Sequence, residues 1–495
     1  MIDDCQFIQC KGTEIIGGAI YLNINNQGQV TISNSSFNQC EAQNGGGIYA
    51  SIQSGGGILT IDGECRFTQC TTQRYGGGIF AWIEGENSKL IIGDGVIFDT
   101  YHVHSITVQA EMEFSFDNCS CKYLGGGLYV FSSSSSISFE NVIQFKDCSN
   151  TDIGGGICVN CTDEGMIEFI GELNFNNCSA SNFGGGGDFC TLNNGHIVTN
   201  NITCNNCKAQ KYGGGISIYS FDENCMIEFS GIITFVDCIG QFGGGLYIEI
   251  HQYGQVIISN RCTFTRCIAE QNGGGIFIDS QQQGILVRIS GYLSFELCQS
   301  QGYGGGLYAY NNNGSIISLT GYCIFKDCSS EQSGGGIYSN ISDGSLNIED
   351  ATFDRCICTQ PGNGGGIALI QGISSIVSIT NSSFINCRTI SNSSNQRYGW
   401  GGAIFIQTSI AAENLNETNF LMRDLIFTGC SAVNSIGNNI HIQSSNTYNI
   451  GIAIALNSLL TVKDTPNLYT SPEYSNYYMG IDQSKVIDGN EPYSD

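Results

Sequence analysis

The chain has 495 residues, and its composition is unusual: 67 are glycine, 25 are cysteine and only 4 are proline. Eighteen Lys and Arg against 44 Asp and Glu give a net charge of −26, which argues against nucleic acid or an anionic membrane as a partner. The scarcity of proline argues against collagen and against a disordered Pro/Gly linker. With no apolar run of transmembrane length in the sequence, we expect no membrane span.

A short unit recurs from the first residues onward. It consists of F-x-x-C, a few variable residues and a glycine triplet, as in Phe67 to Cys70 followed by Gly76 to Gly78. Self-similarity at a period of about 30 residues is typical of repeat architectures. The cysteines that close the unit, which we call the cysteine ladder, are Cys10, Cys40, Cys70, Cys119, Cys148, Cys178, Cys207, Cys238, Cys267, Cys298, Cys328, Cys356, Cys387 and Cys430.

Each period contains three short runs in which apolar and polar residues alternate. One run precedes the motif, such as 255–258. The second carries F-x-x-C itself, and the third follows the glycines, such as 246–250. Alternation with a period of two, bounded by Gly, Asn and Ser, indicates β-strands. Three strands in each coil of about 30 residues predict an all-β parallel β-helix, a solenoid of roughly 14–16 coils.

The period defines the expected domains. We predict a β-helix over 1–462, with an irregular coil near 98–118 and loop insertions near 391–397 and 413–419. Residues 463–495 lose the period and contain tyrosine and proline, which suggests a cap, a docking segment or a linker. Because the first residues enter the repeat at once, we also expect a piece of a longer chain, or a subunit whose end docks on another.

The repeated Phe is expected to point inward and to stack on the Phe of the next coil. Cysteines stacked in register could form either a ladder of buried thiols or a series of disulfides, and both alternatives stay open. Cys158 with Cys161 and Cys204 with Cys207 have C-x-x-C spacing, but each lacks a second pair suited to zinc. We therefore predict no metal and no other cofactor.

An aromatic residue usually follows the first inward residue after the glycines, so alternation places it on the outer face. Two interpretations remain open: stacking that stabilises the parallel sheet, or an apolar face for lateral assembly or for stacking sugar rings. The members of this candidate aromatic ladder are Tyr21, Tyr49, Phe80, Tyr129, Tyr247, Phe277, Tyr308, Tyr338 and Phe405.

Ten N-x-S/T sequons, together with the cysteine content, predict an extracellular or cell-surface glycoprotein. A chain rich in Asn and Ser also produces sequons by chance, so only some are expected to be modified. The candidate sites are Asn34, Asn118, Asn160, Asn177, Asn201, Asn313, Asn340, Asn381, Asn392 and Asn416.

No catalytic constellation stands out. Polysaccharide-cleaving β-helices need clustered acidic residues in one groove, and we find no such cluster on adjacent coils. The five histidines are scattered, and no Cys–His signature of a nucleophile is present. We predict no catalytic residues and no enzymatic activity.

The alternation of F-x-x-C with GGG-[IL]-[YF] resembles the F-x-x-N and GGA-[ILV] repeats of the chlamydial polymorphic outer membrane proteins. It is also similar to Cys-rich right-handed β-helix surface proteins of protists. Gly17 to Ile20 and Gly401 to Ile404 have the GGA-I form itself. This chain places Cys where that family has Asn, and it has no segment resembling the family's outer-membrane barrel. The resemblance implies a right-handed β-helix, surface display, and adhesive or structural work.

Three hypotheses follow for function. The first is a rigid glycosylated structural solenoid that self-associates, end to end or laterally, into a filament, coat or adhesive stalk. The alternative is an adhesin or carbohydrate-binding module that uses the outward aromatic ladder. A polysaccharide lyase or glycosidase is the least favoured.

Overall fold

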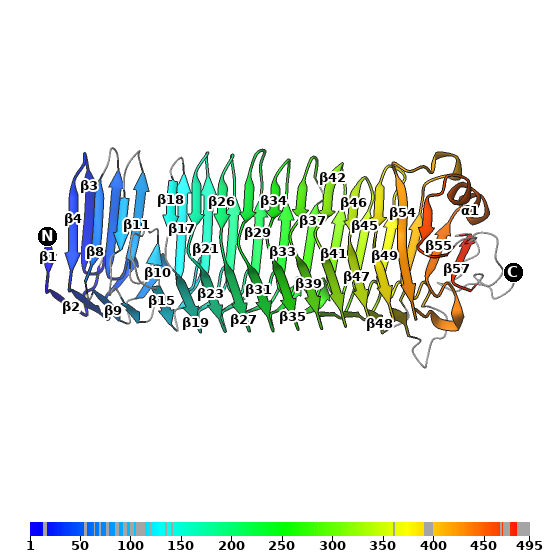
Figure 1. The fold of residues 1–495 in the computed structure, drawn as a ribbon. Coiled ribbons are helices and arrows are strands. Elements are labelled where there is room, and N and C mark those ends of the chain that lie inside the picture. Colours follow the sequence, from blue (N-terminus) through cyan, green and yellow to red (C-terminus); the bar gives the residue numbers. More distant parts are fainter. Residues whose placement is uncertain are drawn as a thin grey trace. The chain divides into compact units, whose positions relative to one another are not determined.

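The computed structural model confirms an all-β parallel solenoid with turns of about 30 residues (Figure 1). The structure describes residues 1–12, 17–53, 57–63, 65–68, 71–75, 79–84, 89–92, 97–99, 103–104, 114–117, 120–133, 136–139, 142–280, 282–359, 362–390, 399–465, 468 and 476–482. The chain forms two compact units, Met1–Gly240 and Gln241–Asp495. Each unit is described by itself below.

A regular turn contains four strands. In unit 1 one such turn consists of β21 (Ile157–Thr162), β22 (Met166–Phe169), β23 (Leu173–Asn176) and β24 (Ser179–Ala180). The first three are the predicted alternating runs. The fourth is a short strand after the ladder cysteine, too brief to show any alternation in the sequence.

The other strands of unit 1 stack in parallel on their counterparts in neighbouring turns. Those after the glycines are β3 (Ile20–Asn25), β7 (Ile48–Gln53), β11 (Ile79–Glu84), β14 (Val103–His104), β17 (Leu128–Ser133), β25 (Gly187–Thr191) and β29 (Ile216–Ser220). Those before the motif are β1 (Ile2–Asp3), β4 (Gln29–Ser33), β8 (Ile58–Asp62), β12 (Lys89–Ile92), β18 (Ser136–Phe139), β26 (His196–Thr199) and β30 (Met226–Phe229). Those carrying the motif are β2 (Gln6–Ile8), β5 (Ser36–Asn38), β9 (Arg66–Thr68), β13 (Ile97–Asp99), β15 (Phe114–Asp117), β19 (Ile143–Lys146), β27 (Ile202–Asn205) and β31 (Ile233–Val236). Those after the cysteine are β6 (Glu41–Asn44), β10 (Thr71–Tyr75), β16 (Ser120–Cys121), β20 (Ser149–Asn150), β28 (Lys208–Ala209) and β32 (Ile239–Phe242), which crosses the unit boundary in sequence.

Unit 2 repeats the same plan. Its strands after the glycines are β33 (Leu246–Ile250), β37 (Ile276–Ser280), β41 (Leu307–Asn311), β45 (Ile337–Ile341), β49 (Ile367–Gln371), β53 (Ile404–Thr408), β55 (Ile440–Ser444) and β57 (Tyr478–Asp482). Before the motif lie β34 (Gln255–Ile258), β38 (Leu286–Ile289), β42 (Ser315–Leu319), β46 (Gly344–Glu349), β50 (Ile376–Thr380) and β56 (Leu460–Val462). The motif strands are β35 (Cys262–Thr265), β39 (Leu293–Glu296), β43 (Cys323–Lys326), β47 (Ala351–Asp354) and β51 (Ser383–Ile385). The long strand β54 (Phe420–Thr428) pairs with β50, a strand before the motif, and with β51, a motif strand. After the cysteine come β36 (Ile268–Asn272), β40 (Gln299–Ser300), β44 (Ser329–Ser330), β48 (Ile357–Cys358) and β52 (Arg388–Thr389).

The solenoid has three main sheets and about 11 turns, fewer than the 14–16 coils expected from the cysteine spacing. The difference lies in the first turns of unit 1, where β1, β4, β8 and β12 form a small sheet of their own and β6 forms a two-stranded sheet with β10. The coils are present there, but their strands do not belong to all three main sheets.

The Phe residues of the motif form the predicted inner column. In unit 2, Phe264, Phe295 and Phe325 pair in register. Their ring centroids lie 4.8 and 4.6 Å apart, and all three rings are fully buried. Stacking one aromatic ring on the next fills the interior of each turn with a repeating side chain.

The structure describes only parts of the predicted irregular regions. In the coil near 98–118, β13 and β15 still pair in register, whereas the loop at 391–397 lies outside the described residues. The insertion near 413–419 includes part of the 3₁₀ helix η1 (Ala412–Asn414), and a second one, η2 (Val433–Ser435), follows later. No described helix is long and apolar enough to cross a membrane.

The predicted boundary at 462 coincides with the end of β56, but two elements around it were not expected. The helix α1 (Thr447–Leu456) lies inside the predicted β-helix domain. Within the predicted tail, β57 adds a parallel strand to β55, in register from Ile440 with Tyr478 to Ser444 with Asp482.

Candidate functional site

The cysteine ladder sits at a tight bend of the backbone. The residue before each described ladder cysteine has a positive φ, as at Asn177 (55°) and Asp327 (53°), a conformation that Asn and Asp tolerate better than most residues. The ladder thiols lie within hydrogen-bonding distance of backbone carbonyls at this bend. Cys328 Sγ lies 3.6 Å from the carbonyl oxygen of Phe295, in the preceding turn, and 3.7 Å from that of Lys326. A thiol has one proton, so it donates to one of these two carbonyls at a time.

The described ladder members are thiols that are not joined in disulfides, and nearly all are buried. Burial raises the pKa of Cys178 and Cys356 well above the usual value of a thiol, so these side chains are protonated and poor nucleophiles. Cys10 is only partly buried, and Cys70 and Cys119 lie outside the described residues. The buried members are Cys40, Cys148, Cys178, Cys207, Cys238, Cys267, Cys298, Cys328, Cys356, Cys387 and Cys430.

The candidate aromatic ladder stacks as alternation predicts. In unit 2 the ring centroids of Tyr247 and Phe277 lie 5.3 Å apart, those of Phe277 and Tyr308 4.7 Å apart, and those of Tyr308 and Tyr338 5.4 Å apart. In unit 1, Tyr21 stacks on Tyr49 at 5.4 Å. These contacts are the cross-strand stacking of the first interpretation.

The exposure expected for that ladder is wrong for most of unit 2. Tyr247 is 3%, Phe277 8% and Phe405 4% exposed, while Tyr308 and Tyr338 are half-buried. For some of these residues, an aromatic residue from the corner before the glycines forms the cover. Phe242 meets Phe277 edge-on at 5.3 Å, and Tyr303 lies 4.5 Å from Tyr338. Sequence alternation could not reveal this cover, because the corner residues vary from turn to turn.

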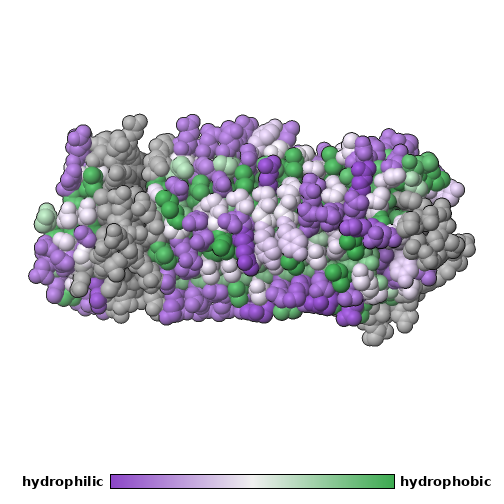
Figure 2. Space-filling model, viewed as in Figure 1, coloured by the Kyte–Doolittle hydropathy of each residue, from purple (hydrophilic) through white to green (hydrophobic). Residues whose placement is uncertain are grey.

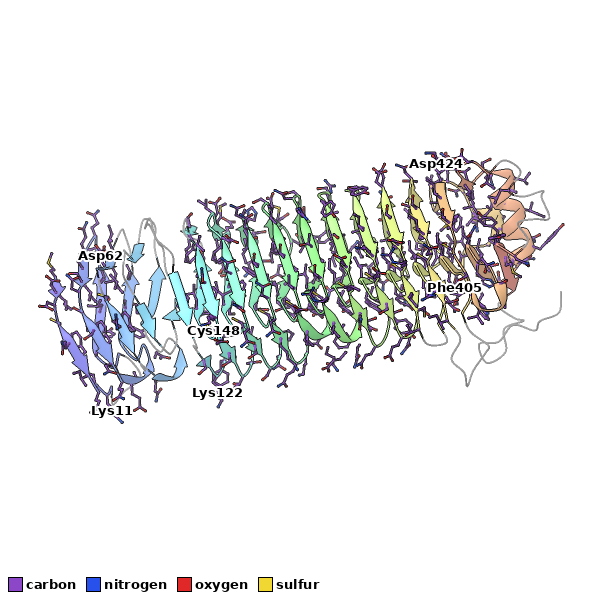
Figure 3. All side chains as sticks on the ribbon, turned by 60° about the horizontal axis from the view of Figure 1, so that its bottom comes forward. Lys11, Asp62, Lys122, Cys148, Phe405 and Asp424 are labelled. Atoms are coloured by element: carbon purple, nitrogen blue, oxygen red, sulfur yellow. The ribbon has the colours of Figure 1, made fainter. Side chains whose placement is uncertain are left out.

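The members of the ladder near its two ends have different surroundings. Phe405, labelled in Figure 3, stacks on His441 at 5.9 Å and lies beside Trp400. Tyr21 is 51% exposed and Tyr129 is half-buried. The backbone of Phe80 pairs in register with that of Tyr49, but its side chain lies outside the described residues.

The sequon asparagines divide by exposure. Asn118 and Asn392 lie outside the described residues, and Asn160, Asn201 and Asn340 are half-buried. The exposed ones are Asn34, Asn177, Asn313, Asn381 and Asn416. Several amide nitrogens are engaged: Asn177 donates to Asp147 at 2.5 Å, Asn381 donates to Asp350, and Asn160 donates to the Tyr129 phenol at 2.9 Å.

A groove runs along one edge of unit 2, at the loops that lead from the strands after the glycines to the strands before the motif. It has a volume of about 800 Å³. Four successive loops contribute to it, those after β33, β37, β41 and β45. We call this the edge groove, and its lining residues are Gln252, Tyr253, Gln282, Gln283, Asn313, Gly314 and Asp343.

Two glycines at equivalent loop positions shape the groove. Gly284 has φ +74°, and a Cβ there would lie 2.2 Å from Cδ1 of Tyr253. The Tyr253 ring therefore covers Gly284, yet 41% of Tyr253 remains exposed. Gly314 also has φ +74°, but a Cβ there would meet nothing within 4 Å. The Tyr253 ring thus bounds the groove at Gly284, whereas the groove is open at Gly314 in the next turn.

A series of hydrogen bonds connects the groove residue Gln282 with Tyr247 on the outer face of β33. The Tyr247 hydroxyl donates to Glu249 Oε2 at 2.8 Å, and Glu249 Oε1 lies 3.0 Å from Nε2 of His251. Gln282 Nε2 lies 3.0 Å from Nδ1 of His251. Since an amide nitrogen can only donate, Nδ1 accepts, and His251 directs its Nε2 proton to Glu249. One groove amide is thereby fixed in orientation.

The groove combines an exposed aromatic ring with side-chain amides and one carboxylate, Asp343. Amides both donate and accept, and carboxylates accept, so together they match neighbouring hydroxyl groups. The exposed face of a tyrosine offers an apolar surface of the size of a sugar ring. Sequence reasoning missed this site because its residues lie in the variable loops, and His251 seemed isolated without its contacts to Glu249 and Gln282.

A second polar cluster is buried on the outer face of unit 1. Asp188 is 4% exposed, and Ser217 Oγ donates to its Oδ1 at 2.5 Å, while Cys158 Sγ lies 3.9 Å from Oδ2. Burial raises the pKa of Asp188 to about 7. The cluster has no groove beside it among the described cavities, so we interpret it as a structural feature.

No protein-family model, no curated protein and no solved structure matches this chain. The chain is a cysteine-rich parallel β-solenoid. Among the described residues, no group of three His, Cys, Asp or Glu side chains is placed to hold a metal ion.

Proposed function

We propose that this protein is an extracellular or cell-surface carbohydrate-binding β-solenoid, and that the edge groove of unit 2 is its binding site. The observation that carries the proposal is the exposed Tyr253 ring beside an open turn bordered by amides. A rigid stack of strands holds the four loops at regular spacing, as a linear chain of sugars requires.

The ligand chemistry follows from the charges. Among the described residues that line the groove, Asp343 is the only carboxylate, and none is Lys or Arg. In a chain of net charge −26, an acidic polysaccharide would be repelled. The groove therefore suits a neutral oligosaccharide, which binds through hydroxyl groups and the apolar face of a pyranose ring.

The proposal differs from the prediction made for the aromatic ladder. That ladder was the expected surface for sugars or for lateral assembly, but Tyr247 and Phe277 are covered in unit 2. Tyr247 instead acts through Glu249 and His251 as the first member of the bonded chain that positions Gln282. The structural role in a filament or coat stays a prediction.

Asn313 connects the proposal with glycosylation, because it is both a sequon asparagine and a groove residue. A glycan attached there would occupy the groove itself. The proposal therefore requires Asn313 to be unmodified in the active protein. Peptide mass spectrometry before and after deglycosylation decides this point.

Binding to an array of neutral oligosaccharides, followed by calorimetric titration of the best ligand, tests the proposal. We expect Tyr253→Ala to weaken binding about 2- to 13-fold, since one stacked aromatic contributes about 0.5–1.5 kcal/mol. Tyr322→Ala is the matched control, because Tyr322 is 55% exposed in the same unit but lies outside the groove. An array without any binding, or unchanged affinity of Tyr253→Ala, would contradict the proposal.

A further inference from the structure

The helix α1 of unit 2 has apolar residues on two opposite sides. Ile450, Ala453 and Ile454 are buried, and α1 contacts β55 and β57. On the other side Tyr448, Ile452 and Leu456 follow one another at a spacing of four residues, and they are 78%, 41% and 79% exposed. A surface helix normally shows polar residues there. We call these three residues the apolar stripe.

An apolar groove lies next to the stripe. Its volume is about 210 Å³, and it is lined by residues of α1, β55, β56 and β57, among them Ile442, Ile454, Leu460 and Met479. Figure 2 shows hydrophobic residues (green) where Figure 1 places α1. A projecting stripe beside an apolar groove is the arrangement that a self-complementary surface requires, because each copy must offer both parts.

The charge pattern of the chain favours a second copy as the occupant. No Asp, Glu, Lys or Arg occurs between Asp424 and Lys463, although the whole chain carries a net charge of −26. Contacts between acidic surfaces are opposed by repulsion of like charges. The apolar stripe and most of the groove lining come from the uncharged stretch, and no Asp, Glu, Lys or Arg is among the described residues that line the groove. The acidic side chains of the elements that α1 contacts are Glu413 of η1 and Asp482 at the end of β57. Two copies can therefore meet through the stripe and the groove without placing a carboxylate in the apolar contact.

Gly451 supports the same conclusion. It lies in the interior of α1, where glycine is less favourable than alanine, and a Cβ at this position would meet no atom of the described residues within 4 Å. No described residue therefore requires a glycine here. Gly451 and Ala455, four residues later, are small residues and lie between the apolar stripe and the groove. Another helix can approach the backbone of α1 closely at these two residues.

We propose that two copies of this protein associate through α1 in an isologous contact, each apolar stripe packing against the stripe and the adjoining groove of the other copy. This contact is independent of the edge groove, which lies in other loops of unit 2. The stripe and the described groove lining offer no charged side chain to pair with a charged partner, and a second copy supplies a matching apolar surface.

Sedimentation velocity of the full chain over a range of concentrations tests the proposal. The wild-type protein is expected to show a monomer–dimer equilibrium. Leu456→Glu should raise the dissociation constant about 100-fold or more, because an unpaired carboxylate would be buried in an apolar contact. Ile373→Glu is the matched control: Ile373 is 73% exposed in the same unit, away from α1, and the same charge there should leave the equilibrium unchanged.

A mixing experiment separates loss of the contact from misfolding. Leu456→Glu and Leu456→Lys should each be monomeric, and an equimolar mixture should form dimers if the two side chains face one another across the contact. A monomeric wild type, or a Leu456→Glu variant that dimerises like the wild type, would overturn the proposal. So would association that weakens as salt is added, since that would indicate a charged contact.

Discussion

The ring of Tyr253 covers Gly284 of the following turn so closely that a single added methyl group would lie 2.2 Å from ring carbon Cδ1. This contact links a backbone requirement to the shape of the edge groove, because Gly284 also has φ +74°. One small substitution therefore tests how the groove is built.

Gly284→Ala is expected to move the Tyr253 ring and to strain the loop, at a cost of about 1–2 kcal/mol in unfolding free energy. Binding of a neutral oligosaccharide should weaken at the same time. Gly314→Ala is the control, since this position has the same φ but open space around it. It should show the loop strain without displacing Tyr253, so equal losses of binding in both variants would argue against the ring as a wall of the site.

Asp188 predicts a pH dependence of stability in unit 1. Its pKa is raised from 3.8 to about 7 by burial. Between pH 4 and pH 7, Asp188 is therefore protonated in the folded state and ionised in the unfolded state. Stability from this group is fully present below about pH 4 and decreases as the pH rises to about 7, by on the order of 4 kcal/mol. Above pH 7 the contribution is constant.

Asp188→Asn should remove this slope and make the protein more stable than the wild type at pH 8, as measured by urea denaturation across the pH range. The amide can still accept the hydrogen bond from Ser217. Asp163→Asn is the comparison, because Asp163 is exposed and hydrogen bonds, first that from Asn193, lower its pKa. That variant should keep the wild-type slope between pH 4 and 7, and loss of the slope there would contradict the assignment to Asp188.

The inner aromatic column predicts a large cost for a core truncation. Phe295 stacks on Phe264 at 4.8 Å and on Phe325 at 4.6 Å, and it is fully buried. Phe295→Ala should lower the unfolding free energy of unit 2 by about 3–5 kcal/mol. Ile373→Ala, at a residue 73% exposed, should change it by less than about 0.5 kcal/mol. Thermal or denaturant unfolding of the two variants compares them directly.

The cysteine ladder predicts protection from alkylation. Cys328 and Cys356 are fully buried, and burial raises the pKa of both thiols. Iodoacetamide should therefore label them only after unfolding, while the partly exposed Cys10 is labelled in the native protein. Peptide mass spectrometry without reductant gives the readout. Ladder cysteines that resist labelling even in denaturant would show that they are paired as disulfides.

The sequence alone determined the repeat and its inward residues. A Phe and a Cys recurring about every 30 residues can pack only if successive turns place them in one column, so a local pattern repeated many times defines the core of the solenoid. The alternation around Tyr247 and Phe277 likewise placed these residues on the outer face of the strand.

Only the tertiary structure decided which residues cover that outer face and which side chains meet on it. Phe242 covers Phe277 from a corner whose residue changes in every turn, and Glu249, His251 and Gln282 meet from two different turns. Such contacts depend on which residues of neighbouring turns become adjacent, and no single repeat contains that information. The exposed ring of Tyr253 and the apolar stripe of α1 arise in the same way, where the chain departs from its repeat.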